Sequence, residues 1–378
     1  EIIQILTKLI RIPSENPPGL EKECTEYIAR QLRDWGIDVE VIREPFEQRP
    51  QAVAIYGTGQ KPILILNGHV DVVPAGDQDA WEVEPYSGIV KEGKLFGRGA
   101  ADMKGGLTAA MLTLKTLKQT NFRLKGTLMV QFAVGEETAE PGTRKLVEKG
   151  FTGNWAIVLE PTGLRVATSV KGLAWYKISV RGQSCHASRP WLGRNAVVKA
   201  CQIIHAMNSY NRLLRARTHR LLGRALATVT MINGGDKENV IPGTCDFVVD
   251  RRILPDERIA NVDDEICRIL QTTVKLEDGF SASWQRYRYY QPAEIPVESR
   301  IAEVVRRYSK EIAGVSEKPF GMLASTDARN FINDAGVPAI TWGPGNLEQA
   351  HTYNEYIELR EIQLAVQILL EVTKELLA

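Results

Sequence analysis

The chain has 378 residues, a formal net charge of +1, and a composition that is 44% hydrophobic and 25% charged. These values are typical of a globular protein of about two or three domains, and they exclude a small isolated module and a disordered or collagen-like chain. The near-zero charge gives no global field that would gather nucleic acid, and no apolar run is long enough to span a bilayer, so we expect neither nucleic acid nor a membrane as a partner.

The five cysteines are scattered along the sequence and show no C-x-x-C spacing. An odd and dispersed set argues against a disulfide framework and favours a reducing compartment. We therefore predict a cytoplasmic protein whose partner is a small molecule.

Apolar periodicity predicts helices and strands that alternate along the first part of the chain. The expected elements are helices at Ile2–Ile10 and Leu20–Trp35, strands at Asp38–Ile42, Gln51–Tyr56 and Pro62–Asn67, a helix at Gly106–Gln119, a strand at Thr127–Val134, a helix at Thr143–Lys149 and a strand at Trp155–Leu159. This alternation predicts an α/β layer structure around a mainly parallel central sheet.

The rhythm changes near Gly172 to the order β-α-β-β-α-β, which is a small ferredoxin-like unit in its own right. Its expected elements are Ala174–Val180, Asn195–Arg215, Ala225–Ile232, Thr244–Arg252, Glu257–Thr273 and Ser281–Tyr289. After Pro292 the α/β pattern resumes with helices at Arg300–Ile312, Thr326–Ala335 and Glu361–Leu377 and a strand at Pro338–Trp342. We predict a domain made of residues 1–172 and 291–378, interrupted by an inserted domain of residues 173–290.

Several predicted strands end in residues that can bind metals. The stretch "ILILNGHVDVVP" runs from four apolar residues into His69, with Asp71 two positions later. Residues i and i+2 share a face of a strand, so one of these side chains can be a ligand and the other its support. His186 and His351 also lie in loops rich in Gly, Pro or Asp. A single histidine is more often an ordinary core or surface residue, so its neighbours must decide.

Carboxylates occupy comparable positions. Asp102 stands before an amphipathic helix, Glu136 and Glu137 end one strand, and Glu160 ends another. Taken singly, Asp102 is explained by helix capping and the glutamate pair by a solvated turn. Together, these groups would meet outside the carboxyl ends of the strands, where open α/β sheets bind ligands. Two histidines and three carboxylates suit a pair of divalent metals, with one further carboxylate left unligated to move a proton.

In this order, the residues resemble the M20 metallopeptidase and deacylase family, which includes acetylornithine deacetylase, succinyl-diaminopimelate desuccinylase, aminoacylase-1 and bacterial glutamate carboxypeptidase. Each motif alone is weak, but together they cover nearly the whole chain. They are G-H-x-D (68–71), G-x-x-D-M-K-G-G (99–106), E-E (136–137), Glu-Pro (160–161), G-Q-S-C-H-A-S-R-P (182–190), G-x-N-A (193–196) and G-P-G…A-H-x-x-N-E (343–355).

The resemblance implies a zinc-peptidase-like catalytic domain that binds two metal ions, with zinc expected and cobalt possible. His69 and Glu160 would hold one ion, Glu137 and His351 the other, and Asp102 would bridge them. The family also implies a cis peptide bond after Asp102.

Further roles follow from the same resemblance. Asp71 would orient His69, and Glu136 would be the general base that takes a proton from the metal-bridging water. The inserted domain would be a lid and a dimerisation surface of a homodimer, and its His186 would reach a neighbouring active site to stabilise the tetrahedral intermediate. The alternative for His186 is an ordinary turn residue near a helix start.

For substrate binding, the resemblance implies Asn239, Arg252 and Arg329 as residues that grip the substrate carboxylate. Arg251 is an equally basic candidate by composition, and only the family's Asp-x-Arg register favours Arg252. The basic run "NRLLRARTHRLLGR" is interpreted as a solvated face, with binding of an anionic substrate or partner as the alternative.

The leading hypothesis is a dinuclear metal-dependent hydrolase that cleaves the amide bond of an N-acyl amino acid. Glu rather than Asp at position 160 goes with deacylases and carboxypeptidases in the family. A carboxypeptidase or dipeptidase acting on short peptides is the second hypothesis. A metal-binding protein without activity is the third, and the presence of Glu136, which no metal requires, argues against it.

Overall fold

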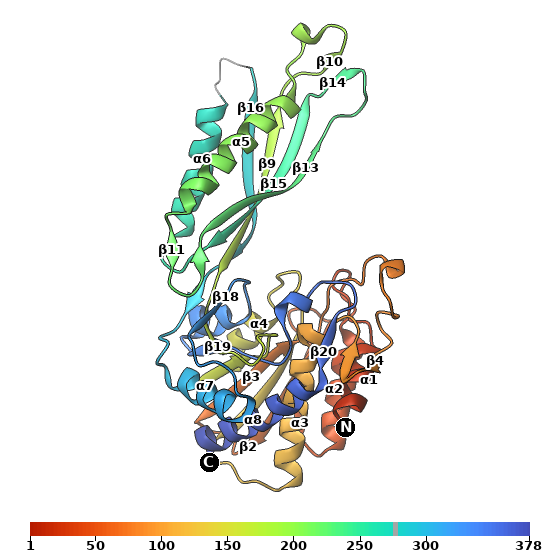
Figure 1. Ribbon diagram of the computed structural model, residues 1–378, viewed down its shortest axis with the longest axis vertical. Coiled ribbons are helices and arrows are strands. Elements are labelled where there is room, and N and C mark those ends of the chain that lie inside the picture. The colour runs from red at the N-terminus through yellow and green to blue at the C-terminus, as the bar shows by residue number, and fades with distance from the viewer. Residues whose placement is uncertain (275–278) are drawn as a thin grey trace. The chain divides into compact units, whose positions relative to one another are not determined.

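The computed structural model describes residues 1–274 and 279–378. The chain forms two compact units (Figure 1). The first contains residues 1–170, 294–322 and 326–378, and the second contains residues 171–293 together with 323–325. Across the described residues, no helix combines the length and the apolar character that a membrane crossing needs.

A mixed nine-stranded sheet forms the centre of the first unit. Its strands, in spatial order, are β1 (Asp38–Ile42), β2 (Gln51–Gly57), β6 (Thr127–Ala133), β3 (Ile63–His69), β7 (Trp155–Val158), β19 (Ala339–Thr341), β8 (Ala167–Val170) and β17 (Ala293–Glu294), with β18 (Phe320–Met322) also paired to β8. The central strands β6, β3, β7 and β19 run parallel, whereas β1, β2 and β8 contribute antiparallel pairs. The predicted α/β class is confirmed, with the parallel strands at the centre of the sheet.

Helices cover both faces of this sheet because its central strands are apolar on both sides. On β3, Leu64 and Leu66 pack into one core cluster, whereas Ile65 between them packs into another on the opposite face. The first cluster lies under α1 (Ile2–Ile10), α2 (Lys22–Asp34), α3 (Gly105–Gln119), α7 (Arg300–Ala313) and α8 (Leu359–Leu377). The second lies under α4 (Gly142–Glu148) and the π-helical turn η5 (Asn330–Asp334).

The second unit is a four-stranded antiparallel sheet in the order β13-β15-β9-β16, with two helices packed on one face. In chain order its elements are β9 (Gly172–Arg181), α5 (Ala196–Leu214), β13 (Leu226–Gly234), β15 (Thr244–Ile253), α6 (Ile259–Thr273) and β16 (Ser281–Tyr290). On β9, Tyr176 and Ile178 are buried under the helices while Lys177 between them is exposed, which is the period of two expected for a strand covered on one side. The predicted β-α-β-β-α-β order is confirmed.

Very short elements escaped the sequence analysis because runs of two to five residues show too little periodicity. They are the strands β8, β17 and β18 named above, the strands β4 (Ile89–Lys91), β5 (Lys94–Phe96), β10 (Cys185–His186), β11 (Thr218–His219), β12 (Gly223–Arg224), β14 (Val240–Ile241) and β20 (Tyr356–Glu358), and the helical turns η1 (Gln78–Ala80), η2 (Ala100–Lys104), η3 (Pro190–Leu192) and η6 (Leu347–Gln349). The helix predicted at Thr326–Ala335 begins two residues later than expected, because residues 328–335 are helical, with the π-helical turn η5 within them.

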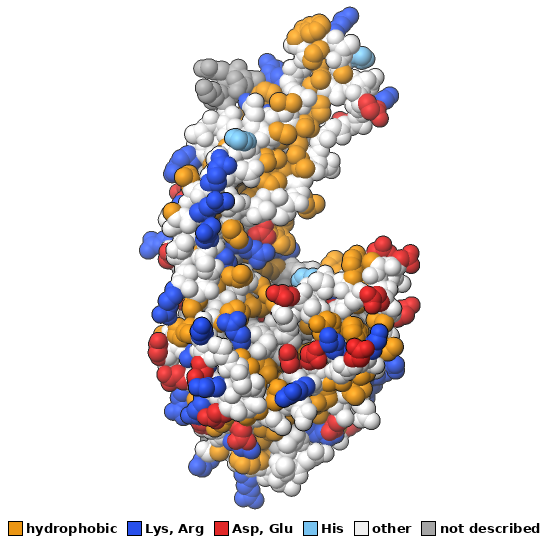
Figure 2. Space-filling model, viewed as in Figure 1, with side chains coloured by type: hydrophobic (Ala, Val, Ile, Leu, Met, Phe, Trp, Pro, Cys, Tyr) orange, Lys and Arg blue, Asp and Glu red, His pale blue; other side chains and the backbone are white. Residues whose placement is uncertain are grey.

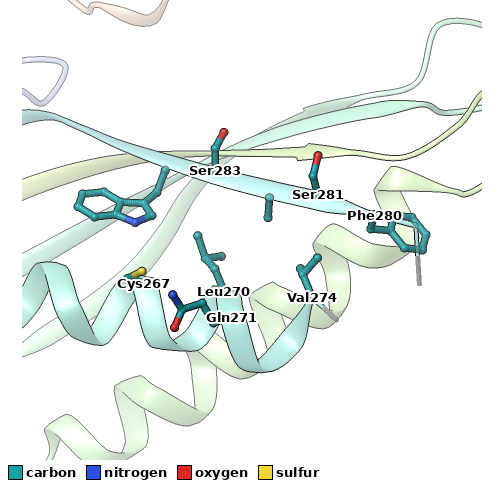
Figure 3. Close-up of a pocket in the computed structure, with 9 residues that line it drawn as sticks. Cys267, Leu270, Gln271, Val274, Phe280, Ser281 and Ser283 are labelled. Carbon is teal, nitrogen blue, oxygen red and sulfur yellow. The ribbon is translucent and has the colours of Figure 1, made fainter. Parts of the chain in front are cut away.

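A cavity of about 620 Å³ opens between α6 and β16 in the second unit (Figure 3). Its lining is mostly apolar and includes Leu270, Val274, Phe280 and Trp284. The described lining residues include no acid and no histidine, so this cavity has none of the groups that the predicted chemistry needs.

On the surface, charged side chains of both signs are interspersed over the first unit (Figure 2), in keeping with the small net charge.

Candidate metal centre

Neighbouring parallel strands end at one edge of the first unit's sheet and bring the candidate ligands there. β3 ends at His69, which pairs with Ala133 at the end of β6. Glu160 follows the end of β7 by two residues, and β7 runs parallel to β3 on its other side. Because parallel strands place their carboxyl ends together, side chains from distant parts of the sequence meet at this edge.

The ligand atoms form two groups that share Asp102. One group is His69, Asp102 and Glu160, and the other is Asp102, Glu137 and His351, with the ligand atoms of each group within 4.8 Å of one another. Asp102 Oδ1 lies 3.2 Å from His69 Nε2, and Asp102 Oδ2 lies 3.5 Å from His351 Nε2. The two oxygens of one carboxylate therefore face two different histidines, as a carboxylate between paired metals must.

A buried carboxylate, which the sequence analysis did not select, holds the turn that carries Asp102. Glu355 accepts hydrogen bonds at 2.9 to 3.0 Å from the backbone N–H groups of Gly99, Ala101 and Asp102. The peptide bond after Asp102 is cis, as the family resemblance implied. Glu355 lies four positions after His351, so it connects the bridging residue to the loop of the second histidine.

Asp71 contacts His69, the residue that it is predicted to orient, and also holds the turn of Glu136 and Glu137. His69 Nδ1 lies 2.9 Å from the backbone oxygen of Asp71 and 3.7 Å from its carboxylate Oδ1. The carboxylate instead accepts hydrogen bonds at 2.9 to 3.3 Å from the backbone N–H groups of Gly135, Glu136 and Glu137. Asp71 therefore fixes His69 through its main chain and fixes the glutamate pair through its side chain.

Further support for the glutamate turn also escaped the sequence analysis. Asn16 Nδ2 donates to Asp71 Oδ2 at 3.2 Å and to Glu140 Oε2 at 3.0 Å, and Glu140 forms an ion pair with Arg49 at 2.6 Å. These residues have no common spacing in the sequence, so only the folded chain brings them together. Glu355, in contrast, belongs to the A-H-x-x-N-E motif, and that motif was a signal that could have identified it.

Glu136 lies beside the two ligand groups but belongs to neither. Its side chain is 14% exposed, and its Oε1 lies 4.0 Å from Arg329 Nη1. Arg329 is itself largely buried and donates from Nη1 to the backbone oxygen of Thr326 at 2.8 Å. The structure thus brings Arg329, a predicted substrate-binding residue, next to the predicted general base.

Burial and crowding shift the pKa values of the clustered groups. Burial raises the pKa of Glu136 to about 8, and burial together with the charge of Asp102 raises the pKa of Glu160 well above its usual value. Burial acts in the same direction on Asp102, but hydrogen bonds from His351 and His69 outweigh it and lower the pKa of Asp102. Hydrogen bonds to Asp102 and Glu137 raise the pKa of His351 to about 11. The site therefore holds more buried carboxylates than its two histidines can pair with, and this crowding favours the protonated forms of Glu136 and Glu160.

This donor set fits a pair of divalent cations. Histidine nitrogen and carboxylate oxygen are the ligands that zinc and related ions take in catalytic sites. Glu137 Oε1 is buried and has no hydrogen-bond partner among the described residues, so a cation would supply the contact that this oxygen lacks.

In the second unit, His186 and Asn239 lie together. β10, which ends in His186, pairs with β14, and the backbone N–H of Ala187 donates to the backbone oxygen of Asn239 at 2.9 Å. Arg252 lies at the opposite end of the unit's sheet, because it is near the end of β15 while β14 precedes the start of that strand. The stretch from Thr244 to Arg252 alone spans roughly 26 Å at about 3.3 Å per residue.

The structure distinguishes Arg251 from Arg252, between which composition alone does not decide. Arg251 is fully buried, and its guanidinium contacts Glu257 and Tyr210. Arg252 has a side chain that is 32% exposed and pairs with Asp250 at 2.9 Å. Arg252 is therefore the arginine of this pair that a solute can reach.

Sequence comparison finds related proteins over most of the chain. The pattern of Peptidase family M20/M25/M40 matches residues 65–375. A probable succinyl-diaminopimelate desuccinylase from Staphylococcus aureus (strain MSSA476) is 29% identical over 386 residues, which cover 95% of this chain and 93% of that protein.

Solved structures share the fold. An M20 family metallo-carboxypeptidase from Sulfolobus solfataricus superposes with a TM-score of 0.84 at 19% identity, covering 99% of this chain and 98% of that one. A dinuclear metal-binding peptidase of the M20 family from Bacillus subtilis superposes with a TM-score of 0.72 at 17% identity, covering 98% and 96% of the two chains.

Proposed function

The chain belongs to Peptidase family M20/M25/M40 and is a metal-dependent hydrolase of amides or peptides, and we propose that its substrate is an N-acyl amino acid. The observation that carries the proposal is the position of Asp102 between two ligand groups, with Glu136 outside both groups and next to them. The relative named as a desuccinylase supports removal of an acyl group, as does Glu at position 160.

We assign the cation positions by ligand group. His69 and Glu160 would hold one divalent ion, Glu137 and His351 would hold the other, and Asp102 would contact both. Zinc suits this donor set best and cobalt is the alternative. A bound pair supplies a Lewis acid for the amide carbonyl and lowers the pKa of water.

Glu136 is the proposed general base. Asp71 fixes its backbone N–H at 3.3 Å, so the side chain is held at the cluster without being a member of either ligand group. A carboxylate that is held at the cluster and is not a ligand can accept a proton from the attacking water and pass it to the leaving amine.

We propose that the enzyme acts as a homodimer joined through the second unit. β13 is an edge strand of the four-stranded sheet and carries the exposed apolar residues Leu226, Met231 and Ile232. Apolar side chains also gather on the face of this unit that Figure 2 shows. An open strand edge with exposed apolar side chains favours pairing with a second copy of the chain.

The separation of Asn239 from Arg252 supports a site shared between subunits. The strand stretch Thr244–Arg252, which lies between them in the chain, spans roughly 26 Å. The two side chains of one unit therefore cannot bind the same amino-acid substrate. In the proposed dimer, Asn239 and His186 would serve the substrate at the partner chain's metal centre, and Arg252 and Arg329 stay the proposed partners of the substrate carboxylate. The guanidinium groups would bind the substrate carboxylate, and His186 would donate to the oxyanion that forms during attack.

The second hypothesis is a carboxypeptidase or dipeptidase, and the high structural similarity to a metallo-carboxypeptidase keeps it open. An inactive metal-binding protein is disfavoured because Glu136 is positioned for proton transfer although it belongs to neither ligand group. For location, the free thiols of all five cysteines support the proposed cytoplasmic environment.

A substrate panel tests the proposal. The zinc-loaded and cobalt-loaded enzyme is assayed with N-acetyl, N-succinyl and N-formyl amino acids and with dipeptides, by release of the free amine. We expect kcat/KM for at least one N-acyl amino acid to exceed that for every dipeptide. Preferential cleavage of dipeptides would favour the peptidase hypothesis, and no turnover of either class would contradict a hydrolase of these substrates.

A further inference from the structure

The segment that carries His186 forms a closed turn. The backbone N–H of Arg189 donates to the backbone oxygen of His186 at 2.9 Å, and the N–H of Ala187 donates to the backbone oxygen of Asn239 at 2.9 Å. The first bond closes the turn and the second ties it to the neighbouring chain segment before β14. His186 and Ser188 are therefore fixed relative to each other by the main chain.

Within this turn, Ser188 bonds to one ring nitrogen of His186 in two ways. Its backbone N–H donates to Nδ1 at 3.1 Å, and its Oγ lies 2.7 Å from the same atom. A backbone N–H can only donate, so Nδ1 must accept and carries no proton in this arrangement. In a neutral imidazole the single proton is then on Nε2.

The tautomer decides what His186 can do. Its side chain is exposed, so Nε2 is accessible to another molecule. A nitrogen that carries the proton donates a hydrogen bond and cannot accept a proton. Nε2 in this state suits an oxygen atom with negative charge, and it cannot act as a general base.

We propose that Ser188 is a positioning residue that fixes the tautomer of His186 and thereby presents Nε2–H as a donor to an anionic oxygen. The inference rests on the proposed function of His186 and adds the residue that sets its chemistry. Its ligand is a carboxylate oxygen or the oxygen of a reacting amide. A donor that is oriented before the reaction costs no reorganisation during it, so Ser188 acts through His186 without touching the substrate.

Nitrogen-15 spectra of histidine-labelled, zinc-loaded full-length protein test the tautomer directly. The chain has five histidines, so each signal can be assigned by replacing one histidine at a time. We expect the neutral His186 to carry its proton on Nε2. His219 is an internal reference, because its Nδ1 accepts from the N–H groups of Leu221 and Leu222 at 3.3 Å. A His186 signal with the proton on Nδ1 would overturn the proposal.

Variants then test whether the hydroxyl of Ser188 matters. Ser188→Ala keeps the backbone N–H that donates to Nδ1, so His186 should keep its proton on Nε2. The variant loses the 2.7 Å contact of Oγ with the ring, so we expect kcat to fall by about five- to tenfold, the equivalent of one hydrogen bond, with little change in KM. Ser188→Thr keeps the hydroxyl and should restore both values. Ser184→Ala makes the same change four residues earlier and should alter neither.

The outcomes separate this proposal from the function on which it rests. If Ser188→Ala leaves kcat unchanged, the hydroxyl of Ser188 does not position His186. If His186 carries its proton on Nε2 while His186→Ala keeps the original kcat, the catalytic role of His186 is wrong and the fixing of its tautomer by Ser188 is still supported.

Discussion

The metal cluster of the first unit and the His186 turn of the second hold their functional groups by different means. The cluster is buried, and hydrogen bonds between residues far apart in sequence support it, as when Asp71 accepts from the turn at Glu136 and Glu137. The His186 turn is exposed, and its internal bonds join residues two or three positions apart. Changes in the cluster should therefore affect metal binding, whereas changes in the turn should affect turnover alone.

The largest effect should come from Asp102→Ala. This change removes the carboxylate whose two oxygens face His69 and His351, at 3.2 and 3.5 Å. We expect loss of both metals and of measurable activity, checked by metal analysis and by assay with the best panel substrate. Asp79→Ala, at an exposed helical turn, is the matched control and should keep both. Full metal content in the Asp102→Ala protein would contradict the bridging role.

Glu136→Gln separates the loss of proton transfer from the loss of metal binding. The side chain belongs to neither ligand group, so we expect the metals to remain while kcat falls by about 10²–10⁴, the usual contribution of a general base. Metal content and kinetics are measured on the same preparation, with the exposed Glu148→Gln as control. If metal content falls in step with activity, the assignment of Glu136 as a base rather than a ligand is wrong.

His186→Ala should lower kcat by about 10²–10³, the usual loss for one donor to an oxyanion, with metal content unchanged. The removal of a side chain from an exposed turn leaves the buried cluster intact, so the thermal midpoint should also stay the same. His205→Ala, on an exposed position of α5 in the same unit, provides the control. Unaltered kcat in His186→Ala would leave this residue as an ordinary part of the turn.

The smallest effect on chemistry should come from Glu355→Gln. The amide keeps the size of the side chain but weakens acceptance of the three N–H groups around Asp102. Residues that support metal ligands typically contribute about 10–100-fold in metal affinity, so we expect weaker zinc binding and nearly normal kcat at saturating zinc. Competition with a chelator measures the affinity. Glu358→Gln, three positions later and partly exposed, should show no change.

Sequence reasoning predicted the parts of the molecule that repeat with a period or follow a motif. The apolar strand at Ile63–His69 and the alternation along Gly172–Arg181 come from the physics of strands that are covered on two faces or one. The meeting of the candidate ligands could be predicted because strand ends in a parallel sheet converge, whereas their division into two groups came from the family resemblance. Nothing in the sequence shows that Asn16, Arg49 and Glu140 meet behind the glutamate turn, since tertiary contacts alone bring them together.

Asp71 shows that the sequence can predict a neighbour without predicting which of its atoms makes the contact. Its position two residues after His69, together with the family resemblance, predicts that Asp71 supports this histidine, but it does not say which atoms of Asp71 make the contact. In the structure, Nδ1 of His69 contacts the backbone oxygen of Asp71. The carboxylate of Asp71 instead accepts hydrogen bonds from three backbone N–H groups of the loop that carries Glu136 and Glu137. Which of several near neighbours a buried carboxylate binds depends on unpaired backbone donors, and these are not visible before the chain is folded.

Complementation between two inactive variants tests most directly the claim that buried cluster and exposed turn serve one site from different subunits. His186→Ala and Glu136→Gln chains are mixed under conditions where exchange of subunits is demonstrated. Random exchange makes half of the dimers hybrids with one complete site of two, so the account predicts recovery of about one quarter of the original activity. No recovery after demonstrated exchange would contradict the shared site.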